Sequence, residues 1–413
     1  MSTPPPEDYR VIRDLARRVA EIAALPQQEH KALAWRRFNR LQADRPMVLI
    51  FPEGAWREVP LELVTTDPFC RRQEWNLRSR IYYHEHLKDD NVVSDVVHCP
   101  LAVKDTGYGI SEQQQRPQEA TGAAHFEPVI VREEDFARLV RKPQVTVDWE
   151  ESQRQYRKTC ELYDGILPVA KGSPGLHTYM AVVDLFAKWR GLEQLLWDLA
   201  DRPAWVHRCL QFLTDGHIEV LDSLERLGAL RLNNGANYVG SGGVGFSDEL
   251  PQKDFDGEHV RPMDLWGFAT TQIFAEVSPA MHEEFALRYE IPFLSRFGLN
   301  CYGCCEPLHR KMDAVKKIPR LRRVSMSPWV DLDRAAAELG DRYVFSRKPN
   351  PAALAAVTWD GESIRRSIRD DLQRTRGCVV ELVMKDTHTV NGCPQRLADW
   401  VRIAKEEAER FAA

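Results

Sequence analysis

The chain has 413 residues, and its shares of apolar (43%) and charged (28%) residues are typical of a globular protein with a large core. The formal charge is −5, and the 56 basic residues are dispersed along the chain, which argues against nucleic acid as a partner. The sequence has no run of about 20 apolar residues that could span a bilayer. Its first residues lack the basic head and apolar run of a signal peptide. We therefore expect a cytoplasmic protein that does not bind membranes.

The first predicted elements are two amphipathic helices over residues 7–25 and 29–42, where apolar residues recur at intervals of three and four. The apolar run over residues 46–50 leads into Pro52 and Gly54 and is typical of a buried strand followed by a loop. Residues 74–87 have a helical pattern. The polar, glycine-bearing segment 104–122 predicts a long loop, and such loops often cover a site.

From residue 145 onward, short apolar runs alternate with longer amphipathic ones. The predicted strands are 165–172, 229–235, 291–303, 321–327, 342–350 and 377–386. The predicted helical segments are 176–189, 191–201, 202–229, 306–318, 331–340, 352–373 and 395–411. This alternation predicts parallel strands joined by crossover helices. Because no glycine-rich dinucleotide fingerprint opens the series, an α/β fold of the closed (β/α)₈ TIM barrel type is favoured over an open doubly wound sheet.

In such a barrel the active site lies at the carboxyl ends of the strands. Side chains that can donate protons, accept them or bind a ligand follow the predicted strands. The loops at the opposite strand ends are short and are not enriched in such side chains. This bias predicts an enzyme. The candidate residues at the strand ends are Lys171, His177, Asn237, Tyr238, Cys304, Glu306, Trp329, Arg347, Lys348, Asn350, Lys385, Asp386 and His388.

The glycine-rich segment 240–246, GSGGVGF, also follows a predicted strand. It lacks both the Lys-Ser/Thr ending and the spacing of phosphate-binding loops. Two interpretations remain open: the segment lets the backbone approach a ligand closely, or it forms a turn.

The nine cysteines are an odd number in a chain without an export signal, so we expect reduced thiols or metal ligands rather than a disulfide framework. Cys301, Cys304 and Cys305 fall within the segment LNCYGCCEPLH, residues 299–309. Adjacent side chains of an extended segment point in opposite directions, so only one of Cys304 and Cys305 is expected to bind a metal ion. The alternative is that these thiols are small core residues.

A catalytic zinc ion needs three protein ligands and one open position, and the ligands can come from different strand ends. The candidate ligands are Cys304 or Cys305, Cys393, and one of His388, Glu306 and His177. Thiolates suit zinc, and zinc keeps a bound substrate thiol deprotonated at neutral pH.

Several segments together resemble the uroporphyrinogen decarboxylase superfamily, which also contains the cobalamin-linked methyltransferases. The segments are 171–184 (KGSPGLHTYMAVVD), 299–318 (LNCYGCCEPLHRKMDAVKKI), 331–354 (DLDRAAAELGDRYVFSRKPNPAAL) and 394–406 (PQRLADWVRIAKE). The resemblance runs from about residue 46 to the C-terminus. It implies a barrel over residues 46–413, with residues 1–45 as an N-terminal helical extension, and a homodimer.

The chemistry that the resemblance implies depends on which branch of the superfamily this chain resembles, the decarboxylases or the zinc methyltransferases. After the first strand this chain has FPEGAWREV instead of the arginine-rich MRQAGR of the decarboxylases. The zinc methyltransferases carry His-x-Cys where this chain has Tyr302 and Cys304, and a distal cysteine where it has Cys393. Tyr302 departs from this pattern, so Glu306, His388 or Cys305 would complete the ligand set, or the branch has a different site.

Three hypotheses follow. The first is a zinc-dependent methyltransferase that moves a methyl group between a small substrate and a corrinoid protein, with Cys304, Cys393 and Glu306 or His388 on the metal. The second is a cofactor-free decarboxylase or lyase, and the third is a non-catalytic binding subunit. The predicted catalytic residues are Glu306, Lys348, Asp386 and His388. The predicted substrate-binding residues are His177, Asn237, Tyr238, Tyr302, Trp329, Asn350 and Lys385.

Overall fold

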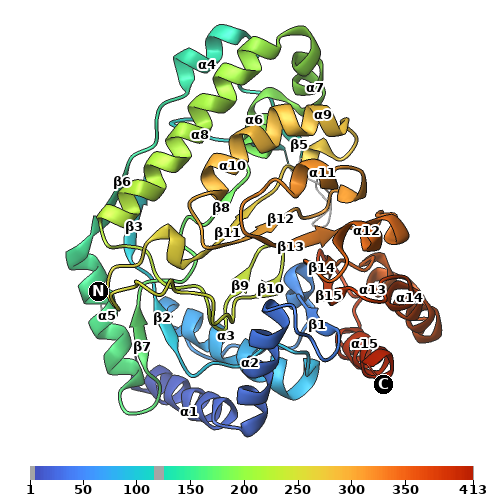
Figure 1. Ribbon diagram of the computed structural model, residues 1–413. Coiled ribbons are helices and arrows are strands. Elements are labelled where there is room, and N and C mark those ends of the chain that lie inside the picture. Colours follow the sequence, from blue (N-terminus) through green and yellow to red (C-terminus); the bar gives the residue numbers. More distant parts are fainter. Residues whose placement is uncertain (1–4, 116–124, 413) are drawn as a thin grey trace.

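A seven-stranded parallel sheet forms the centre of the computed structural model, which describes residues 5–115 and 125–412 (Figure 1). The strand order is β1-β15-β14-β13-β12-β11-β8, and each neighbouring pair is parallel. The bounds are β1 Met47–Ile50, β8 Tyr179–Met180, β11 Trp266–Ala269, β12 Leu299–Tyr302, β13 Leu321–Met326, β14 Val344–Arg347 and β15 Val379–Met384. The α/β class and the parallel strands predicted from the sequence are confirmed.

Most residues of these strands are buried, which explains why apolar residues are frequent in them; Tyr179 of β8 is an exposed exception. All four residues of β1 and all six of β15 are buried. One ion pair lies between two strands of the sheet: Arg323 Nε of β13 is 2.9 Å from Glu381 Oε1 of β15. The buried interior of the sheet therefore contains an ion pair as well as apolar side chains.

Crossover helices follow successive strands at the β13 to β15 side of the sheet, to the right in Figure 1. They are α12 (Leu332–Leu339), α13 (Ala352–Ala355), α14 (Gly361–Arg374) and α15 (Gln395–Ala412). The helices near the β8 and β11 edge are α6 (Val182–Arg190), α7 (Leu192–Asp201), α8 (Pro203–Arg226), α9 (Pro279–His282), α10 (Arg288–Leu294) and α11 (Met312–Val315). Helix α8 begins with Pro203 in its first turn, as predicted.

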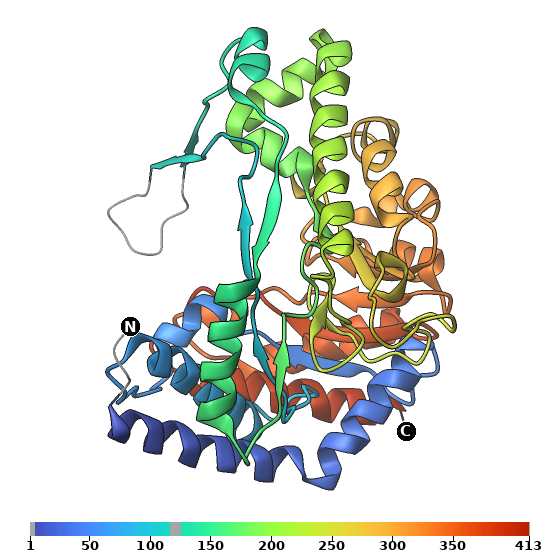
Figure 2. The same ribbon diagram turned by 90° about the vertical axis from the view of Figure 1, so that its left-hand side faces the viewer.

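The N-terminal helices also match the sequence pattern. Helix α1 (Pro6–Ala23) runs along the bottom of the molecule in both views and packs on α3 (Pro68–Tyr82) and α5 (Trp149–Tyr163) (Figures 1 and 2). Helix α2 (Pro26–Asn39) buries Trp35 and Phe38 in one cluster with residues of β1. The remaining helix, α4, spans Glu133–Leu139.

Four two-stranded sheets complete the described part of the chain. They are β2 (Val97–Cys99) with β7 (Val169–Lys171), β3 (Ala102–Asp105) with β6 (Val145–Asp148), β4 (Gln113–Gln115) with β5 (His125–Glu127), and β9 (Tyr238–Val239) with β10 (Gly243–Val244). The β3 and β6 ribbon is the long vertical pair in Figure 2. The loop predicted over residues 104–122 thus contains parts of β3 and β4, and its residues 116–122 lie outside the described residues.

Four predictions about strands were wrong or incomplete. The segment 165–172 does contain a strand, β7, but β7 pairs with β2 outside the central sheet. The segment 229–235 is irregular, because the Asn233 side chain, rather than a strand backbone, bonds the backbone of Trp266. Residues 291–294 continue helix α10 and only 299–302 form a strand. Strands β8 and β11 were not predicted: β8 has two residues and lies within the predicted helix 176–189, and β11 contains a glycine and no β-branched residue.

None of the helices in the described ranges is long and apolar enough to cross a membrane.

Candidate active site

The site is built around Cys304, which lies two residues beyond the carboxyl end of β12. Ser241 Oγ, from the loop between β9 and β10, lies 3.1 Å from Cys304 Sγ. Lys385, the first residue after β15, places Nζ 3.7 Å from Cys304 Sγ and 3.2 Å from Ser241 Oγ. Parallel strands end at the same edge of a sheet, so β12 and β15 bring the thiol and the ammonium group together although 81 residues separate them.

The glycine-rich segment positions Ser241 by lying directly against the sheet. Gly240 and Gly242 have φ angles of 65° and 111°, in the region that favours glycine. A Cβ atom at Gly240 would lie 2.6 Å from Cys301 Cβ, and one at Gly242 would lie 2.8 Å from Val383 Cγ1. The glycines therefore let the backbone approach side chains of β12 and β15. The first interpretation of GSGGVGF was that the glycines let the backbone approach a ligand closely. In the structure the backbone does make a close approach, and the group that it approaches is the sheet.

The surroundings of Cys304 favour its thiolate. The pKa of Cys304 is lowered to about 6 by the Cys305 thiol, the positive charge of Lys385 and the Ser241 hydroxyl, which together outweigh the opposing effect of burial. The same pairing raises the pKa of Cys305. Cys304 is 8% exposed, so its thiolate is largely shielded from water yet reaches the surface.

The prediction that Cys304 and Cys305 point in opposite directions was wrong. Their Sγ atoms lie 3.6 Å apart. The segment bends instead of running extended, and Gly303 at its start has a φ of 84°. Cys305 is exposed, and its Sγ lies 3.6 Å from Asp386 Oδ2, so Asp386 lies beside this pair of cysteines.

Buried hydrogen bonds hold the backbone of Cys304 in place. Glu306 Oε2 accepts the N–H of Cys304 at 2.8 Å, and Glu306 Oε1 accepts the Thr270 hydroxyl at 2.7 Å. The Ser325 hydroxyl donates to the Cys304 carbonyl at 2.8 Å. Glu306 is fully buried. Both of its oxygens are therefore engaged in shaping the loop, which is a positioning role rather than the predicted catalytic or metal-binding one.

Lys348 extends the site into the interior of the sheet. Its Nζ donates to Ser346 Oγ at 2.7 Å, and the side chain is buried. Burial lowers the pKa of Lys348 to about 8, against the opposing influence of the Glu381 carboxylate. Two lysines, Lys348 and Lys385, therefore bring positive charge to the region around Cys304.

Glu53 belongs to this region and was missed by the sequence analysis. It begins the short 3-10 helix Glu53–Arg57 that follows β1, and its charge interacts with those of Lys385, Asp386 and His388. Burial raises the pKa of Glu53. Glu53 and Asp386 have φ angles of 44° and 58°, which are uncommon for residues other than glycine and are typical of functional loops. The sequence signal that could have identified Glu53 was its position just beyond the first predicted strand. Ser241 carried a weaker signal, as the one polar residue among the glycines.

Tyr302, at the position of the expected histidine, lies in a separate buried network. Its hydroxyl donates to Glu290 Oε2 at 2.7 Å and lies 2.8 Å from His282 Nε2. Burial raises the pKa of Glu290 to about 8 and lowers that of His282 to about 3. Tyr302 is 1% exposed, and these contacts give it a structural role in the buried network.

Several predicted site residues have other partners. His177 Nε2 lies 2.9 Å from the carbonyl oxygen of His217 in α8, and the two rings lie 4.0 Å apart. Asn237 Nδ2 donates to the Asn233 carbonyl at 2.8 Å. Asn350 Oδ1 accepts the N–H of Ala352 at 2.9 Å, which stabilises the turn before α13. These contacts give His177, Asn237 and Asn350 local structural roles.

The other predicted residues lie at exposed positions. Trp329 is 72% exposed, and His388 and Cys393 are also exposed. Tyr238 stacks edge-on against Phe51, which follows β1, with ring centroids 4.5 Å apart. Of this group, His388 lies near Glu53, with which its charge interacts.

The predicted zinc ligands do not assemble into a site. Within residues 5–115 and 125–412, no three His, Cys, Asp or Glu side chains are grouped so that they could hold a metal ion. Glu306 uses both oxygens for other contacts, and Cys393 lies in an exposed turn where its N–H donates to the Val390 carbonyl. The donor set Cys304, Cys393 and Glu306 therefore does not fit zinc in this arrangement.

No protein-family model matches the chain, and no match is found among the curated proteins. Among solved structures, a methyltransferase from Methanosarcina mazei is similar with a TM-score of 0.43 and 10% sequence identity, over 81% of this chain and 84% of that chain. At these values the similarity assigns neither a family nor an activity to this protein.

Proposed function

We propose that this protein is a methyltransferase in which the Cys304 thiolate is the group that takes up the methyl. The observation that carries the proposal is the thiol held by Ser241 Oγ at 3.1 Å and Lys385 Nζ at 3.7 Å, with a pKa lowered to about 6. A thiolate is a strong nucleophile toward saturated carbon, and it is the dominant form of Cys304 at neutral pH. The sequence resemblance to the cobalamin-linked methyltransferases is the reason to propose that the transferred group is a methyl.

The step is a displacement at the methyl carbon. The Cys304 sulfur attacks this carbon in line with the bond to the donor atom, a carbon–sulfur bond forms, and the bond to the donor atom breaks. Its electron pair leaves with the donor atom. A donor oxygen, nitrogen or sulfur atom could take a proton from Lys385, whereas a corrinoid donor needs no proton. Cys304 becomes a methyl thioether. Glu306 and Ser325 hold the backbone of Cys304, at 2.8 Å each, so that the sulfur keeps its direction of attack.

This proposal replaces the predicted zinc ion by the thiolate itself and keeps a corrinoid protein as the proposed partner. A direct test uses methylcobalamin as the methyl donor and mass spectrometry of the protein. We expect the peptide with Cys304 to gain a methyl group in place of one hydrogen, and Cys304→Ser to gain none. Cys393→Ser, which removes an exposed cysteine outside the site, should behave as the wild type.

Two results would contradict the proposal. One is equal methylation of Cys304→Ser and the wild type, which would place the acceptor elsewhere. The other is stoichiometric zinc in the purified protein that is lost in Cys304→Ser, which would restore the metal-dependent alternative.

A lyase that acts on a carboxylated substrate is the second candidate, and the lysines at the site favour it. Lys385 and Lys348 can bind a carboxylate near Cys304. The other predicted cations are engaged elsewhere: Arg347 Nε lies 2.8 Å from Asp371 Oδ2, and Lys171 Nζ donates to Gln153 Oε1 at 2.8 Å. Release of carbon dioxide without methylation of Cys304 would identify this alternative.

We also propose that the sheet belongs to a closed (β/α)₈ barrel over residues 46–413, with residues 1–45 as its extension. Contacts that link the two edges support closure. The backbone N–H of Asp90, which precedes β2, donates a hydrogen bond to the carbonyl oxygen of Val48 in β1. Arg231 Nε donates to the carbonyl oxygen of Lys171 at the end of β7. Asn233 then bonds both backbone groups of Trp266 in β11 at 2.9 and 3.0 Å.

A further inference from the structure

Cys304 and Cys305 bring two sulfur atoms together at the protein surface. The Sγ atoms lie 3.6 Å apart, Cys305 is exposed, and Cys304 is 8% exposed. A disulfide bond is about 2.0 Å long, so the two atoms must approach by about 1.6 Å to join. The bond would close an eight-membered ring, which is strained because adjacent Cα atoms lie about 3.8 Å apart, closer than in ordinary disulfides. The bend after Gly303 produces this proximity, which an extended segment would not allow.

The two sulfur atoms have different neighbours. Ser241 Oγ and Lys385 Nζ donate toward Cys304 Sγ, and both donors stabilise a thiolate. Cys305 donates its S–H toward Asp386 Oδ2 at 3.6 Å, and a carboxylate keeps a neighbouring thiol protonated. The pair therefore combines one nucleophilic sulfur with one sulfur that retains its proton until it reacts.

We infer that Cys304 and Cys305 form a vicinal dithiol that peroxides oxidise reversibly to a disulfide. In the first step the Cys304 thiolate attacks one oxygen of the peroxide, a sulfur–oxygen bond forms, and the oxygen–oxygen bond breaks. With hydrogen peroxide the departing hydroxide takes up a proton and becomes water. Cys304 is then a sulfenic acid, the first oxidation state of a thiolate.

In the second step the Cys305 sulfur attacks the Cys304 sulfur. A sulfur–sulfur bond forms, the sulfur–oxygen bond breaks, and the departing hydroxide takes the proton of Cys305, which Asp386 Oδ2 is placed to relay. The two sulfurs together lose two electrons, which reduce one peroxide to two waters. Exposed and strained disulfides are the ones that thiols reduce readily, so reduction returns the dithiol.

The disulfide would remove the thiolate on which methyl uptake depends. This consequence rests on the proposed function, whereas formation of the disulfide does not. Oxidised protein should therefore lose methylation of Cys304 by methylcobalamin, and dithiothreitol should restore it.

The test treats the full-length protein with equimolar hydrogen peroxide, then alkylates it with iodoacetamide under denaturing conditions. We expect the peptide with Cys304 and Cys305 to be two hydrogens lighter and not alkylated, and to carry two alkyl groups after dithiothreitol. Cys305→Ser should stop at the sulfenic acid, which dimedone captures on Cys304. The control Cys393→Ser removes one exposed cysteine that is not part of the pair, and it should give the wild-type result.

A second probe, phenylarsine oxide, binds pairs of close thiols. It should bind the reduced wild type and Cys393→Ser in a one-to-one ratio, and Cys305→Ser at least tenfold more weakly. Two alkyl groups on the peroxide-treated peptide, or a disulfide from Cys304 to a different cysteine, would overturn the inference. A disulfide in a protein that methylcobalamin never methylates would overturn the proposed function alone.

Discussion

The reactivity of Cys304 depends on a few neighbouring groups rather than on the cysteine itself. An isolated cysteine is mostly protonated at neutral pH, because its usual pKa is about 8.5. The Cys305 thiol, Lys385 and Ser241 lower the pKa of Cys304 to about 6. Each of these groups comes from a turn or loop after a strand, so the lowered pKa of Cys304 exists only in the folded protein.

Replacing Lys385 by methionine should make Cys304 less reactive at neutral pH. The thiolate is the reactive form of Cys304, and it predominates when the pH is above the pKa that Cys304 has in the folded protein. Loss of the positive charge raises that pKa, and a rise of about one unit would lower the thiolate fraction at pH 7 about twofold. The rate of Cys304 alkylation by iodoacetamide, measured from pH 5 to pH 9, reports the pKa.

The matched control is Lys104→Met, which removes an exposed lysine of β3. Its alkylation profile should follow that of the wild type. Superimposable profiles for Lys385→Met and Lys104→Met would show that Lys385 does not stabilise the thiolate.

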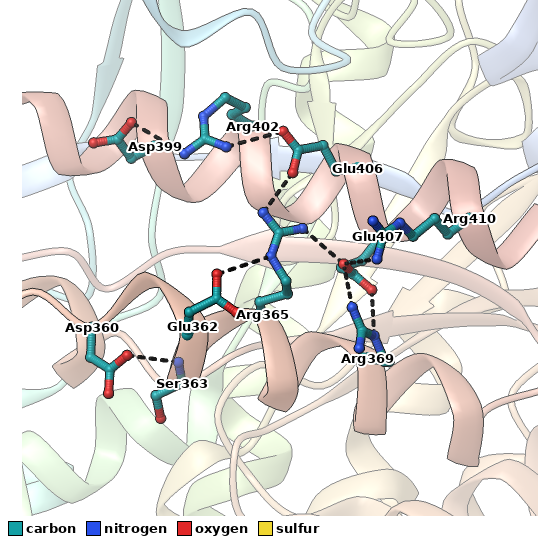
Figure 3. A network of polar contacts seen from close by, with 10 residues as sticks. All are labelled: Asp360, Glu362, Ser363, Arg365, Arg369, Asp399, Arg402, Glu406, Glu407 and Arg410. Carbon is teal, nitrogen blue, oxygen red and sulfur yellow. Dashed lines mark hydrogen bonds and ion pairs between the residues drawn. The ribbon is translucent and has the colours of Figure 1, made fainter.

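At the scale of elements, α14 and α15 are joined by a network of charges around Glu407 (Figure 3). Glu407 Oε1 and Oε2 each accept a hydrogen bond of 2.8 Å, from Arg365 Nη1 and Arg369 Nε respectively. Arg369 and Arg365 lower the pKa of Glu407 to about 2, against the opposing effect of burial. The Glu407 side chain is buried although its partners are partly exposed. This arrangement is stronger than an ordinary surface ion pair.

Glu407→Gln should lower the free energy of unfolding by about 1.5–3 kcal/mol, because two arginines lose their charged acceptor. Denaturation by guanidinium at pH 7 measures the loss. The carboxylate has a lower pKa in the folded chain than in the unfolded chain. The stabilisation is therefore complete above about pH 5 and disappears as the pH falls toward 2.

Glu409→Gln, at an exposed position of the same helix, is the control and should change the free energy of unfolding by less than about 0.5 kcal/mol. The role of Glu407 would be refuted if both variants unfolded at the same denaturant concentration.

For the whole molecule, α2 connects the N-terminal segment to the sheet. Asn39, at the end of α2, donates through Nδ2 to the carbonyl oxygens of Val244 and Phe246 and accepts from Arg323 Nη2 at 2.7 Å. Trp35 is fully buried, and its Nε1 donates to the Asp90 carbonyl at 2.8 Å. The helix therefore closes the core beside β1 instead of lying on the surface.

Trp35→Ala should lower the free energy of unfolding by about 3–5 kcal/mol, because it leaves a cavity and an unpaired carbonyl. Leu33→Ala, on the same helix at 50% exposure, should cost less than about 1 kcal/mol. Thermal and guanidinium denaturation compare the two variants. Similar losses for both would mean that α2 is not part of the cooperative core.

Much of the fold was predictable from local patterns. Apolar periodicity identified α1, α2, α8 and α15, and short segments rich in apolar residues identified β1, β13, β14 and β15. Strand β8 escaped because its two residues carry too little pattern. Strand β11 is as long as β1, but its sequence WGFA contains a glycine and no β-branched residue. Buried parallel strands also need no alternation of polar and apolar residues, so short ones resemble any apolar stretch.

By itself the sequence determined the α/β class, the parallel strands and the placing of Cys304, Lys385 and Asp386 at strand ends. These features follow from local periodicity and from the rule that parallel strands end at one edge. Only the tertiary structure decided which groups meet. The bend after Gly303 turned Cys304 and Cys305 toward each other, and the glycine-rich loop delivered Ser241. Distances between segments far apart in the chain depend on packing, so no local pattern records them.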